Sequence, residues 1–306
     1  MRVGGRSGPS VGAGAAAGDC DETPLGSMTP QADSRSATAS TATPEPVATP
    51  TEGPSRPPTR TLGAGASVFV VVMENQPAAV ALAQPYTAAL ASRFAVAADY
   101  HAIGHPSLPN YLALTSGSTF GIQDDGYHLL PRSGIGDQLE RRGISWRAYM
   151  EGLTGDCRQD HGRYAVRHDP FAYYGGTCPG QVVSFGPLDA DLAGAGTPRF
   201  AWITPDTCHD GHDCSARDAD AFLARLVPKI LASPAWTRGG VLLLTWDEDD
   251  GETGNQVTTI VASPELKAQR SDRPYDHYSL LATTEDLLRV PRLGAANQAL
   301  AFDDLL

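Results

Sequence analysis

The stretch GGVLLLTWDEDDG, residues 239–251, contains the strongest strand signal in the chain. Residues 241–246 are almost all apolar, which is typical of a parallel strand that is buried on both faces. Four of the five residues that follow Trp246 are acidic. Ligands of open α/β sheets bind at the carboxyl ends of the strands, so these acidic residues indicate where a site would lie.

Two other predicted strands also end in polar residues. SVFVVVMEN (67–75) ends in Glu74 and Asn75, and RFAWITPD (199–206) ends in Asp206. Strands and helical patterns alternate along the chain, which predicts one α/β domain with a mainly parallel sheet. We expect strands at 67–73, 144–150, 199–205, 241–246 and 256–263, helices at 86–94, 107–116, 136–143, 216–233 and 277–290, and loops at 98–106 and 151–187.

The first 62 residues differ in composition from the rest of the chain. They are rich in Ala, Thr, Ser, Pro and Gly and show no apolar periodicity. Such a segment cannot bury enough apolar surface to offset its ordering entropy, so we expect residues 1–62 to be a disordered tail and residues 63–306 to form the folded domain. The tail favours a secreted or cell-envelope protein. Cys20 within it is either a free thiol or a lipid-attachment site.

The charge balance limits the classes of partner. The chain has a net charge of −12 at pH 7, which argues against nucleic acid as a partner, because nucleic-acid-binding surfaces are usually basic. No apolar run approaches the roughly 18 residues that span a bilayer, so we expect no transmembrane segment.

The four cysteines of the expected domain form two pairs that are close in sequence. Cys157 with Cys178 and Cys208 with Cys214 would make two local disulfides in an oxidising compartment. The alternative for the second pair is zinc, because the segment CHDGHDC contains two Cys and two His. We favour disulfides.

HPSLPNYLALTSG, residues 105–117, combines a helix start with polar residues that a plain helix does not need. Ser107 precedes an apolar helical run that Gly117 can stop. Ser107 is therefore either an N-cap or a nucleophile. The helix start would offer backbone N–H groups to a phosphate, and Asn110 could donate to a phosphate oxygen in the transition state.

The polar strand ends supply hard oxygen donors. Glu74, Asn75, Asp247 and Glu248 suit Mg, Ca or Mn, or Zn or Fe if a histidine joins them. Such a cation would lower the pKa of the Ser107 hydroxyl and polarise a phosphoryl oxygen. Asp249, Asp250 and Glu252 are better explained as turn residues.

Six segments occur in a fixed order over about residues 67–296 and carry a family resemblance. They are VVVMEN, HPSLPNYLALTSG, YAVRHDPFAYY, FAWITPDTCHDGHDCS, LLLTWDEDDG followed by NQVTTIV, and DHYSLLATTEDLLRVPRLG. Together they resemble the bacterial phosphoesterase family of secreted acid phosphatases and, more distantly, phospholipase C enzymes. The resemblance implies an alkaline-phosphatase-like α/β/α sandwich with a mainly parallel central sheet. It also implies a metal-activated Ser or Thr nucleophile and a covalent phospho-enzyme.

The resemblance assigns roles to particular residues. Ser107 matches the nucleophile and is counted with the metal ligands, and Asn110 matches a phosphate-binding asparagine. The expected metal ligands that match the family pattern are Glu74, Asn75, Asp247 and Glu248. Asp206 stands where many members have Asn, and an Asp there could serve a second metal.

The resemblance also points to histidines. His212 and His277 could protonate the leaving group, contact phosphate or bind a second metal. His105 either braces its loop or contacts substrate, and Arg167 with His168 either grips phosphate or fixes the long loop. We expect Trp146, Trp202 and Trp246 to pack in or beside the core; His101, His128 and His161 have no motif support.

These observations predict an exported, metal-dependent phosphomonoesterase that acts on small phosphate esters or phospholipid head groups. Ser107 would attack phosphorus, and water would hydrolyse the phosphoserine. One alternative is a phosphodiesterase or phospholipase C on the same scaffold. Another is a non-catalytic surface protein that is stabilised by its metal.

Overall fold

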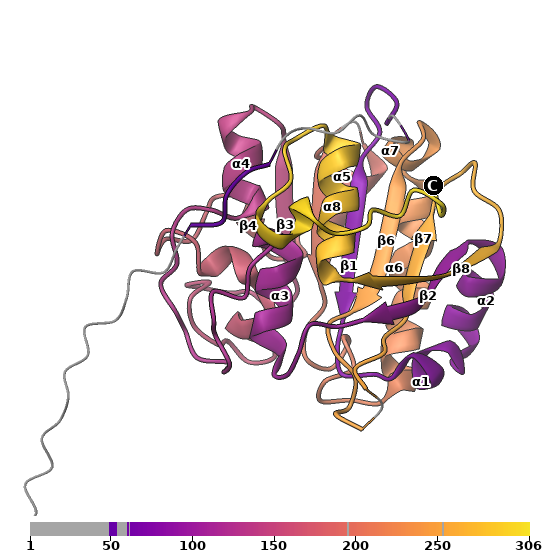
Figure 1. The fold of residues 1–306 in the computed structure, drawn as a ribbon, viewed down its shortest axis with the longest axis horizontal. Helices are drawn as coiled ribbons and strands as arrows, with labels where there is room; N and C mark the ends of the chain where they lie inside the picture. Colours follow the sequence, from indigo (N-terminus) through magenta and orange to yellow (C-terminus); the bar gives the residue numbers. More distant parts are fainter. Residues whose placement is uncertain (1–48, 54–59, 61, 195, 253) are drawn as a thin grey trace, which may run out of the picture. The chain divides into compact units, whose positions relative to one another are not determined.

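The computed structural model describes residues 49–53, 60, 62–194, 196–252 and 254–306. An eight-stranded sheet runs through the domain in the order β4-β3-β5-β1-β6-β7-β2-β8 (Figure 1). All neighbours are parallel except at β7, which is antiparallel to both β6 and β2. The strands are β1 (Val68–Met73), β2 (Ala95–His101), β3 (Trp146–Met150), β4 (Val182–Val183), β5 (Phe200–Thr204), β6 (Val241–Trp246), β7 (Thr259–Ala262) and β8 (Gln269–Asp276).

The centre of the sheet is built from the apolar runs of β1, β5 and β6. All six residues of β1 are buried. Val71 lies opposite Ile203 on one side and Leu244 on the other. Continuous apolar strands of this kind are stable only where both faces of the sheet are covered. The predicted mainly parallel sheet is confirmed.

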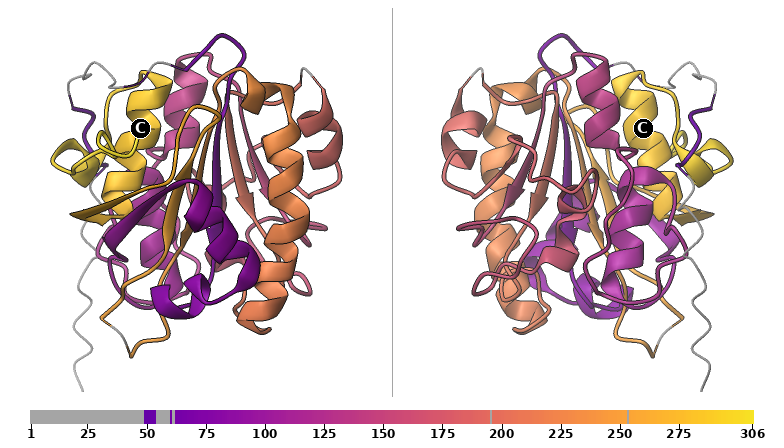
Figure 2. Two further views of the ribbon diagram at one scale, coloured as in Figure 1. Left: turned by 90° about the vertical axis from the view of Figure 1, so that its right-hand side faces the viewer. Right: turned by 90° about the vertical axis from the view of Figure 1, so that its left-hand side faces the viewer.

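Helices cover both faces of the sheet, as the edge-on views of Figure 2 show. One layer contains α1 (Ala78–Leu82), α2 (Pro85–Arg93), α5 (Leu188–Ala193), α6 (Ala216–Ala232) and α7 (Pro234–Thr237). The other contains α3 (Ser107–Ser116), α4 (Ile135–Arg141) and α8 (His277–Leu288), with the short 3₁₀ turns η1 (Val166–His168), η2 (Pro170–Ala172) and η3 (Gly294–Asn297). The expected α/β/α sandwich is therefore confirmed.

The structure corrects the sequence-based expectation at the far edge of the sheet. The segment 98–106, expected as a loop, begins as strand, because β2 continues to His101 and pairs with β8. The strand β8 was not expected at all: its sequence QRSDRPYD is polar and mostly exposed. Charged residues and a proline are typical of an edge strand, where apolar alternation is absent.

Part of the segment that was expected to be a disordered tail contacts the domain. Thr51 accepts a hydrogen bond from the Gly294 N–H at 3.0 Å. The Glu52 carboxylate pairs with Arg141 at 3.0 Å and Arg142 at 2.8 Å. The expectation for residues 1–48, and with it Cys20, lies outside the described residues. Within the described part of the chain, no helix has the length and apolar character that crossing a membrane requires.

Both expected disulfides are present. Cys157 is bonded to Cys178 and Cys208 to Cys214. The zinc alternative for CHDGHDC is therefore wrong, because the sulfur atoms of Cys208 and Cys214 are joined to each other. The expected core tryptophans are buried as well: Trp146, Trp202 and Trp246.

Candidate active site

Ser107 is the first residue of α3 rather than its N-cap, a position that Pro106 occupies. Its side chain is only 2% exposed. The Oγ hydroxyl lies 3.2 Å from Oε2 of Glu74 and 3.4 Å from Oε1 of Glu248. The serine therefore faces carboxylates from two strand ends and does not cap its own helix.

Glu74 follows β1 directly and is fully buried. Its Oε1 accepts a hydrogen bond from the Tyr111 hydroxyl at 2.5 Å and lies 3.3 Å from Nε2 of His168. Burial and the nearby carboxylates of Asp247 and Asp210 raise the pKa of Glu74 well above its ordinary value. A buried carboxyl group in this setting retains a proton unless positive charge compensates it.

Asn75 and Asp247 meet where β1 and β6 end side by side. Asn75 has a φ of 47°, and its N–H donates to Oδ1 of Asp247 at 3.2 Å. Burial raises the pKa of Asp247 to about 7. Among the described residues, neither Oδ1 of Asn75 nor Oδ2 of Asp247 has a hydrogen-bond partner. Buried polar atoms normally have a hydrogen-bond partner. A bound cation, which these two oxygens could coordinate, would account for the missing partners.

Glu248 connects the serine to the loop before α3. One carboxylate oxygen, Oε2, lies 3.0 Å from Nδ1 of His105 and accepts a hydrogen bond from Nδ2 of Asn110 at 3.1 Å. The other end of the His105 ring approaches Asp249 at 3.3 Å. Burial, followed by the charge of Asp247, raises the pKa of Glu248 to about 9.

Asn110 shapes the loop that precedes the serine. Its Oδ1 accepts hydrogen bonds from the N–H groups of Ile103 and Gly104, and its Nδ2 donates to the Gly104 carbonyl at 2.8 Å. These bonds fix the path of residues 103–107. In this arrangement the amide braces the loop and contacts Glu248, whereas the resemblance implied a contact with phosphate.

Glu74 forms a buried trio with His168 and Asp210. His168 in η1 stacks on the Tyr111 ring, with centroids 5.4 Å apart. Its Nδ1 lies 3.2 Å from Oδ2 of Asp210. Glu74, His168 and Asp210 bring their ligand atoms within 4.8 Å of one another. Burial lowers the pKa of His168 well below its ordinary value, so the ring is neutral at pH 7.

His212 and Arg167 form the more open side of the cluster. The Arg167 guanidinium donates to Nε2 of His212 at 3.1 Å. The Nδ1 of His212 lies 2.7 Å from the Asp213 carboxylate. Because arginine only donates and carboxylate only accepts, this His212 carries its proton on Nδ1. Asp125 lies 3.9 Å from the Arg167 Nε and accepts a hydrogen bond from the Leu108 N–H at the start of α3.

His277 is fully buried at the start of α8. Its Nε2 lies 2.5 Å from the Asp247 carbonyl and its Nδ1 lies 2.8 Å from the Tyr100 hydroxyl. The carbonyl only accepts, so Nε2 carries the proton and Nδ1 accepts from Tyr100. Both ring nitrogens are therefore engaged in hydrogen bonds, and the ring fixes the position of the Asp247 carbonyl.

Asp206 lies in a separate cluster. Its Oδ1 accepts hydrogen bonds from the N–H groups of Cys208 and His209. It groups with Glu151 and His209, whose ligand atoms lie within 4.8 Å of its own. The hydrogen bonds of Asp206 thus build the turn at 206–209, and Asp210 instead supplies the carboxylate that lies beside Glu74 and His168.

Sequence reasoning missed three residues of this site. Tyr111 is adjacent to Asn110, Asp210 lies two residues before His212, and Asp125 belongs to a segment without a motif. The first two stand inside segments that had already been singled out, so their position was a usable signal. Nothing in the sequence around Asp125 indicates that it returns to the start of α3.

A serine at a helix start, facing acidic strand ends of an α/β/α sheet, defines an alkaline-phosphatase-like fold. A solved structure from Vibrio parahaemolyticus, of a protein in the alkaline phosphatase superfamily, matches with a TM-score of 0.58 at 12% identity over 82% of this chain and 74% of that chain. At this identity the likeness shows the fold alone. Residues 72–291 match the Phosphoesterase family. The chain belongs to the Phosphoesterase family and is a hydrolase of phosphate ester bonds.

Relatives that are named as phosphatases agree with this family. The phosphatidylinositol-3-phosphatase of Mycobacterium tuberculosis (strain ATCC 25618 / H37Rv) is 30% identical over 249 residues, which cover 78% of this chain and 82% of the relative. A probable acid phosphatase of Kluyveromyces lactis is 30% identical over 247 residues, 74% of this chain but only 59% of the fungal protein. The predicted family and enzyme class are thereby confirmed.

Proposed function

We propose that the chain is an exported phosphomonoesterase that requires a divalent cation and forms a phosphoserine at Ser107. The observation that carries the proposal is the position of the Ser107 Oγ, within 3.4 Å of carboxylates from Glu74 and Glu248 at the start of α3. A serine hydroxyl is a weak nucleophile by itself and needs an adjacent base or a cation.

The residues present fit a divalent cation. Asn75, Asp247, Glu74 and Glu248 would hold it, because they offer buried oxygen donors and two of these oxygens have no other partner among the described residues. When bound, the cation supplies the positive charge that lowers the hydroxyl pKa and polarises a phosphoryl oxygen. An all-oxygen donor set favours Mg, Ca or Mn over softer metals.

The chain's own residues perform the proton transfers. The Ser107 hydroxyl gives its proton to the Glu74 or Glu248 carboxylate as its Oγ forms a bond to phosphorus and the ester P–O bond breaks. Once Arg167 has moved from Nε2 of His212 to the phosphate oxygens, that nitrogen takes a proton from solvent while Asp213 holds the Nδ1–H, and the leaving alkoxide receives the Nε2 proton. Water then attacks phosphorus and gives a proton to the vacated Nε2 of His212; the P–Oγ bond breaks, the Glu74 or Glu248 carboxyl returns its proton to Oγ, and inorganic phosphate leaves with the serine restored.

The setting favours anionic substrates and export. Arg167 and the N-terminal N–H groups of α3 supply positive charge to a phosphate. Small phosphate esters and phospholipid head groups both fit this chemistry, and the Mycobacterium tuberculosis relative is named for a lipid phosphate. The two disulfides support an oxidising compartment.

The test is the Ser107→Ala variant with p-nitrophenyl phosphate as substrate. We expect turnover to fall on the order of 10³-fold or more, with an unchanged Tm. Ser116→Ala, at the other end of the same helix, is the matched control and should keep its activity.

Mass spectrometry of wild type quenched during turnover should find phosphate on Ser107. Near-normal turnover by Ser107→Ala would remove the serine from the mechanism. Faster cleavage of bis(p-nitrophenyl) phosphate than of the monoester would favour the diesterase alternative.

A further inference from the structure

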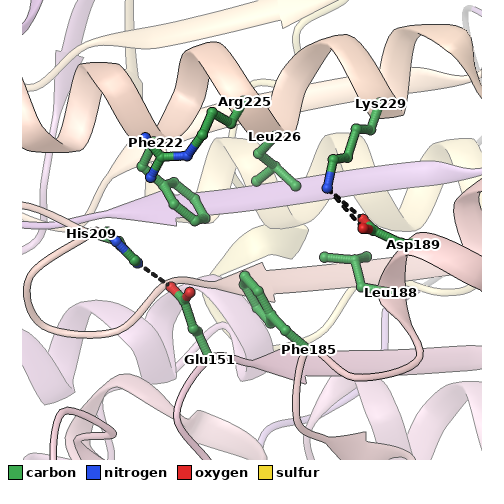
Figure 3. A pocket seen from close by; sticks show the side chains of 9 residues that line it. All are labelled: Glu151, Phe185, Leu188, Asp189, His209, Phe222, Arg225, Leu226 and Lys229. Atoms are coloured by element: carbon green, nitrogen blue, oxygen red, sulfur yellow. Dashed lines mark hydrogen bonds and ion pairs between the residues drawn. The ribbon is translucent and has the colours of Figure 1, made fainter.

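A pocket of about 560 Å³ opens between α5 and α6, outside the cluster around Ser107. Its walls are apolar in the middle and charged at the ends (Figure 3). The apolar residues are Phe185, Leu188, Phe222 and Leu226. Figure 3 shows Glu151 and His209 together at one end and Asp189 with Lys229 at the other. A cavity with this lining suits an apolar group rather than a second phosphate.

The charges on the rim leave one cation without a carboxylate partner. Lys229 pairs with Asp189 at 2.7 and 2.8 Å, and His209 pairs with Glu151 at 2.8 Å. The Arg225 guanidinium lies over the Phe222 ring, 5.8 Å from its centroid, and within the described chain no ion pair involves it. Glu151 and Asp189 balance Arg225 and Lys229, so the charges of the rim select neither an anionic nor a cationic molecule, and the apolar middle of the pocket decides what it accepts.

The charged end that contains Glu151 and His209 is joined to the catalytic cluster by consecutive contacts. Glu151 accepts a hydrogen bond from the Asp206 N–H, and Asp210 N–H donates to the Asp206 carbonyl. Asp210 in turn contacts His168 beside Glu74. Glu151 follows β3 and Glu74 follows β1, with β5 between them, which places the two strand ends about 10 Å apart.

One loop serves both regions. His209 lines the pocket and stacks on Phe222, with ring centroids 4.9 Å apart. Three residues later, His212 contacts Arg167 on the open side of the cluster. The disulfide between Cys208 and Cys214 closes this loop. The 208–214 loop thus contacts the pocket through His209 and the open side of the catalytic cluster through His212.

We propose that the substrate is an amphiphilic phosphate monoester whose apolar part occupies this pocket while its phosphate is hydrolysed at Ser107. This inference rests on the proposed function. It predicts a length threshold, because about 10 Å separates the two strand ends. Short alkyl groups end before the pocket and gain nothing. Longer ones bury methylenes among Phe185, Leu188 and Leu226.

The experiment is a series of n-alkyl phosphates from two to twelve carbons, hydrolysed by the full chain with its divalent cation below their micelle-forming concentrations. We expect kcat/KM to be flat for the short members and then to rise by roughly three- to fourfold for each added methylene, until the pocket is full. A flat series across all lengths overturns the proposal.

Two variants make the result specific. Phe185 is partly buried at the pocket wall. Phe185→Asp should lower the ratio of kcat/KM for decyl phosphate to that for p-nitrophenyl phosphate by at least about tenfold, because it places a charge against the methylenes. Leu82 is a matched control: it is also partly buried and lines a different cavity of about 460 Å³. Leu82→Asp should leave the ratio unchanged. An unchanged ratio in Phe185→Asp, or an equal fall in Leu82→Asp, overturns the proposal.

A binding measurement separates this proposal from the proposed function. Calorimetry with decyl phosphate uses the full chain carrying Ser107→Ala, alone and combined with Phe185→Asp, because the wild type would hydrolyse this ligand during the measurement. We expect decyl phosphate to bind more tightly than ethyl phosphate, and Phe185→Asp to abolish the difference. If p-nitrophenyl phosphate is not hydrolysed but this difference is found, the proposed function fails and the pocket assignment stands. If it is hydrolysed and the two phosphates bind equally, the pocket assignment fails alone.

Discussion

His212 and His277 were both predicted from the sequence as catalytic histidines, but their surroundings differ. His277 has both ring nitrogens engaged, and burial lowers its pKa to about 4. It therefore stays neutral between pH 5 and pH 8, and we infer that it positions the backbone of Asp247. His212 is partly exposed, and its Nε2 accepts a hydrogen bond from Arg167. A bound phosphate would compete for this guanidinium and leave Nε2 without that donor.

Substituting each histidine by Gln should separate these roles. With an alkyl phosphate, His212→Gln should lower kcat on the order of 10²-fold. With p-nitrophenyl phosphate the loss should be much smaller, because that leaving group needs no proton. His277→Gln should lower both rates by the same factor and leave the pH profile unchanged. Equal loss on both substrates for His212→Gln would contradict its assignment as the acid.

Glu285 in α8 is a buried carboxyl group outside the site. One oxygen accepts the Leu293 N–H at 2.9 Å, and the other has no partner among the described residues. Burial raises the pKa of Glu285 well above its ordinary value of 4.5. Above pH 4.5 the folded chain therefore holds a proton that the unfolded chain has lost. The stability contribution of this group accordingly falls as pH rises, until the folded-state pKa is reached.

Glu285→Gln should remove that pH dependence. We expect the free energy of unfolding of the variant, minus that of wild type, to increase between pH 5 and pH 8. The increase should not exceed about 1.4 kcal/mol per pH unit. Urea unfolding at several pH values measures the difference, with the exposed Glu140→Gln as control. A difference that is constant over this range would show that Glu285 does not hold its proton in the folded chain.

At the level of single residues, the sequence located the site where polar residues follow buried strands. Glu74 and Asp247 were predicted in this way; in the structure Glu74 contacts Ser107, and Asp247 accepts a hydrogen bond from the N–H of Asn75, the residue after Glu74. Asp206 obeys the same rule yet turns toward His209, because its carboxylate is needed to build the turn. Asp125 reaches α3 through a long loop, and no local pattern encodes such a return.

Among the elements, the two disulfide-closed loops should respond differently to loss of their cross-links. Cys157 and Cys178 are 21 residues apart, and Cys208 and Cys214 are 6 apart. Replacing the first pair by Ala should cost about 3 kcal/mol of stability and the second about 2, because the longer loop gains more entropy when unfolded. Chemical denaturation under non-reducing conditions measures both.

The activities should show the opposite order. The short loop contains Asp210 and His212 and lies beside the catalytic cluster. The long loop is also anchored by the buried rings of Phe171 and Tyr173. We therefore expect kcat/KM to fall more when the short loop is opened. A larger activity loss from the Cys157–Cys178 variant would show that this disulfide, and not the aromatic anchors, positions the long loop.

The elements that the sequence predicted best are those with apolar periodicity. The run at 241–246 and the helix at 216–233 agree with β6 and α6 to within one residue at each end. The edge strand β8 could not be found in this way. Its residues are mostly exposed, and its strand conformation comes from pairing with β2, which is 174 residues earlier in the chain when Ala95 is matched with Gln269. Pairing between strands that are far apart in the chain produces no local sequence pattern.

For the whole molecule, alternating strands and helices predicted the layers but not the strand order. The ends of β1 and β6 deliver Glu74 and Asp247 to one place because the two strands are neighbours, although more than 160 residues separate them. Right-handed crossovers and helices on both faces limit the possible orders without selecting one. The convergence of Ser107 on both strand ends is therefore a property of the assembled sheet.

This convergence of buried carboxylates makes a bound cation a determinant of the stability of the whole domain. Without one, burial raises the pKa of Glu74, Asp247 and Glu248, and the charge of Asp247 raises the pKa of Glu74 and Glu248 further. A cation that binds only the folded chain stabilises it by about 2.7 kcal/mol at one hundred times its Kd. We expect a chelator to lower the Tm of the full chain by roughly 5 to 10 °C, and Mg, Ca or Mn to restore it. Asp247→Asn should abolish the cation-dependent shift, whereas Asp189→Asn, on the outer helix layer, should keep it. If neither the chelator nor added cations change the Tm of the wild type, then protons, and not a metal, compensate the charges of these carboxylates.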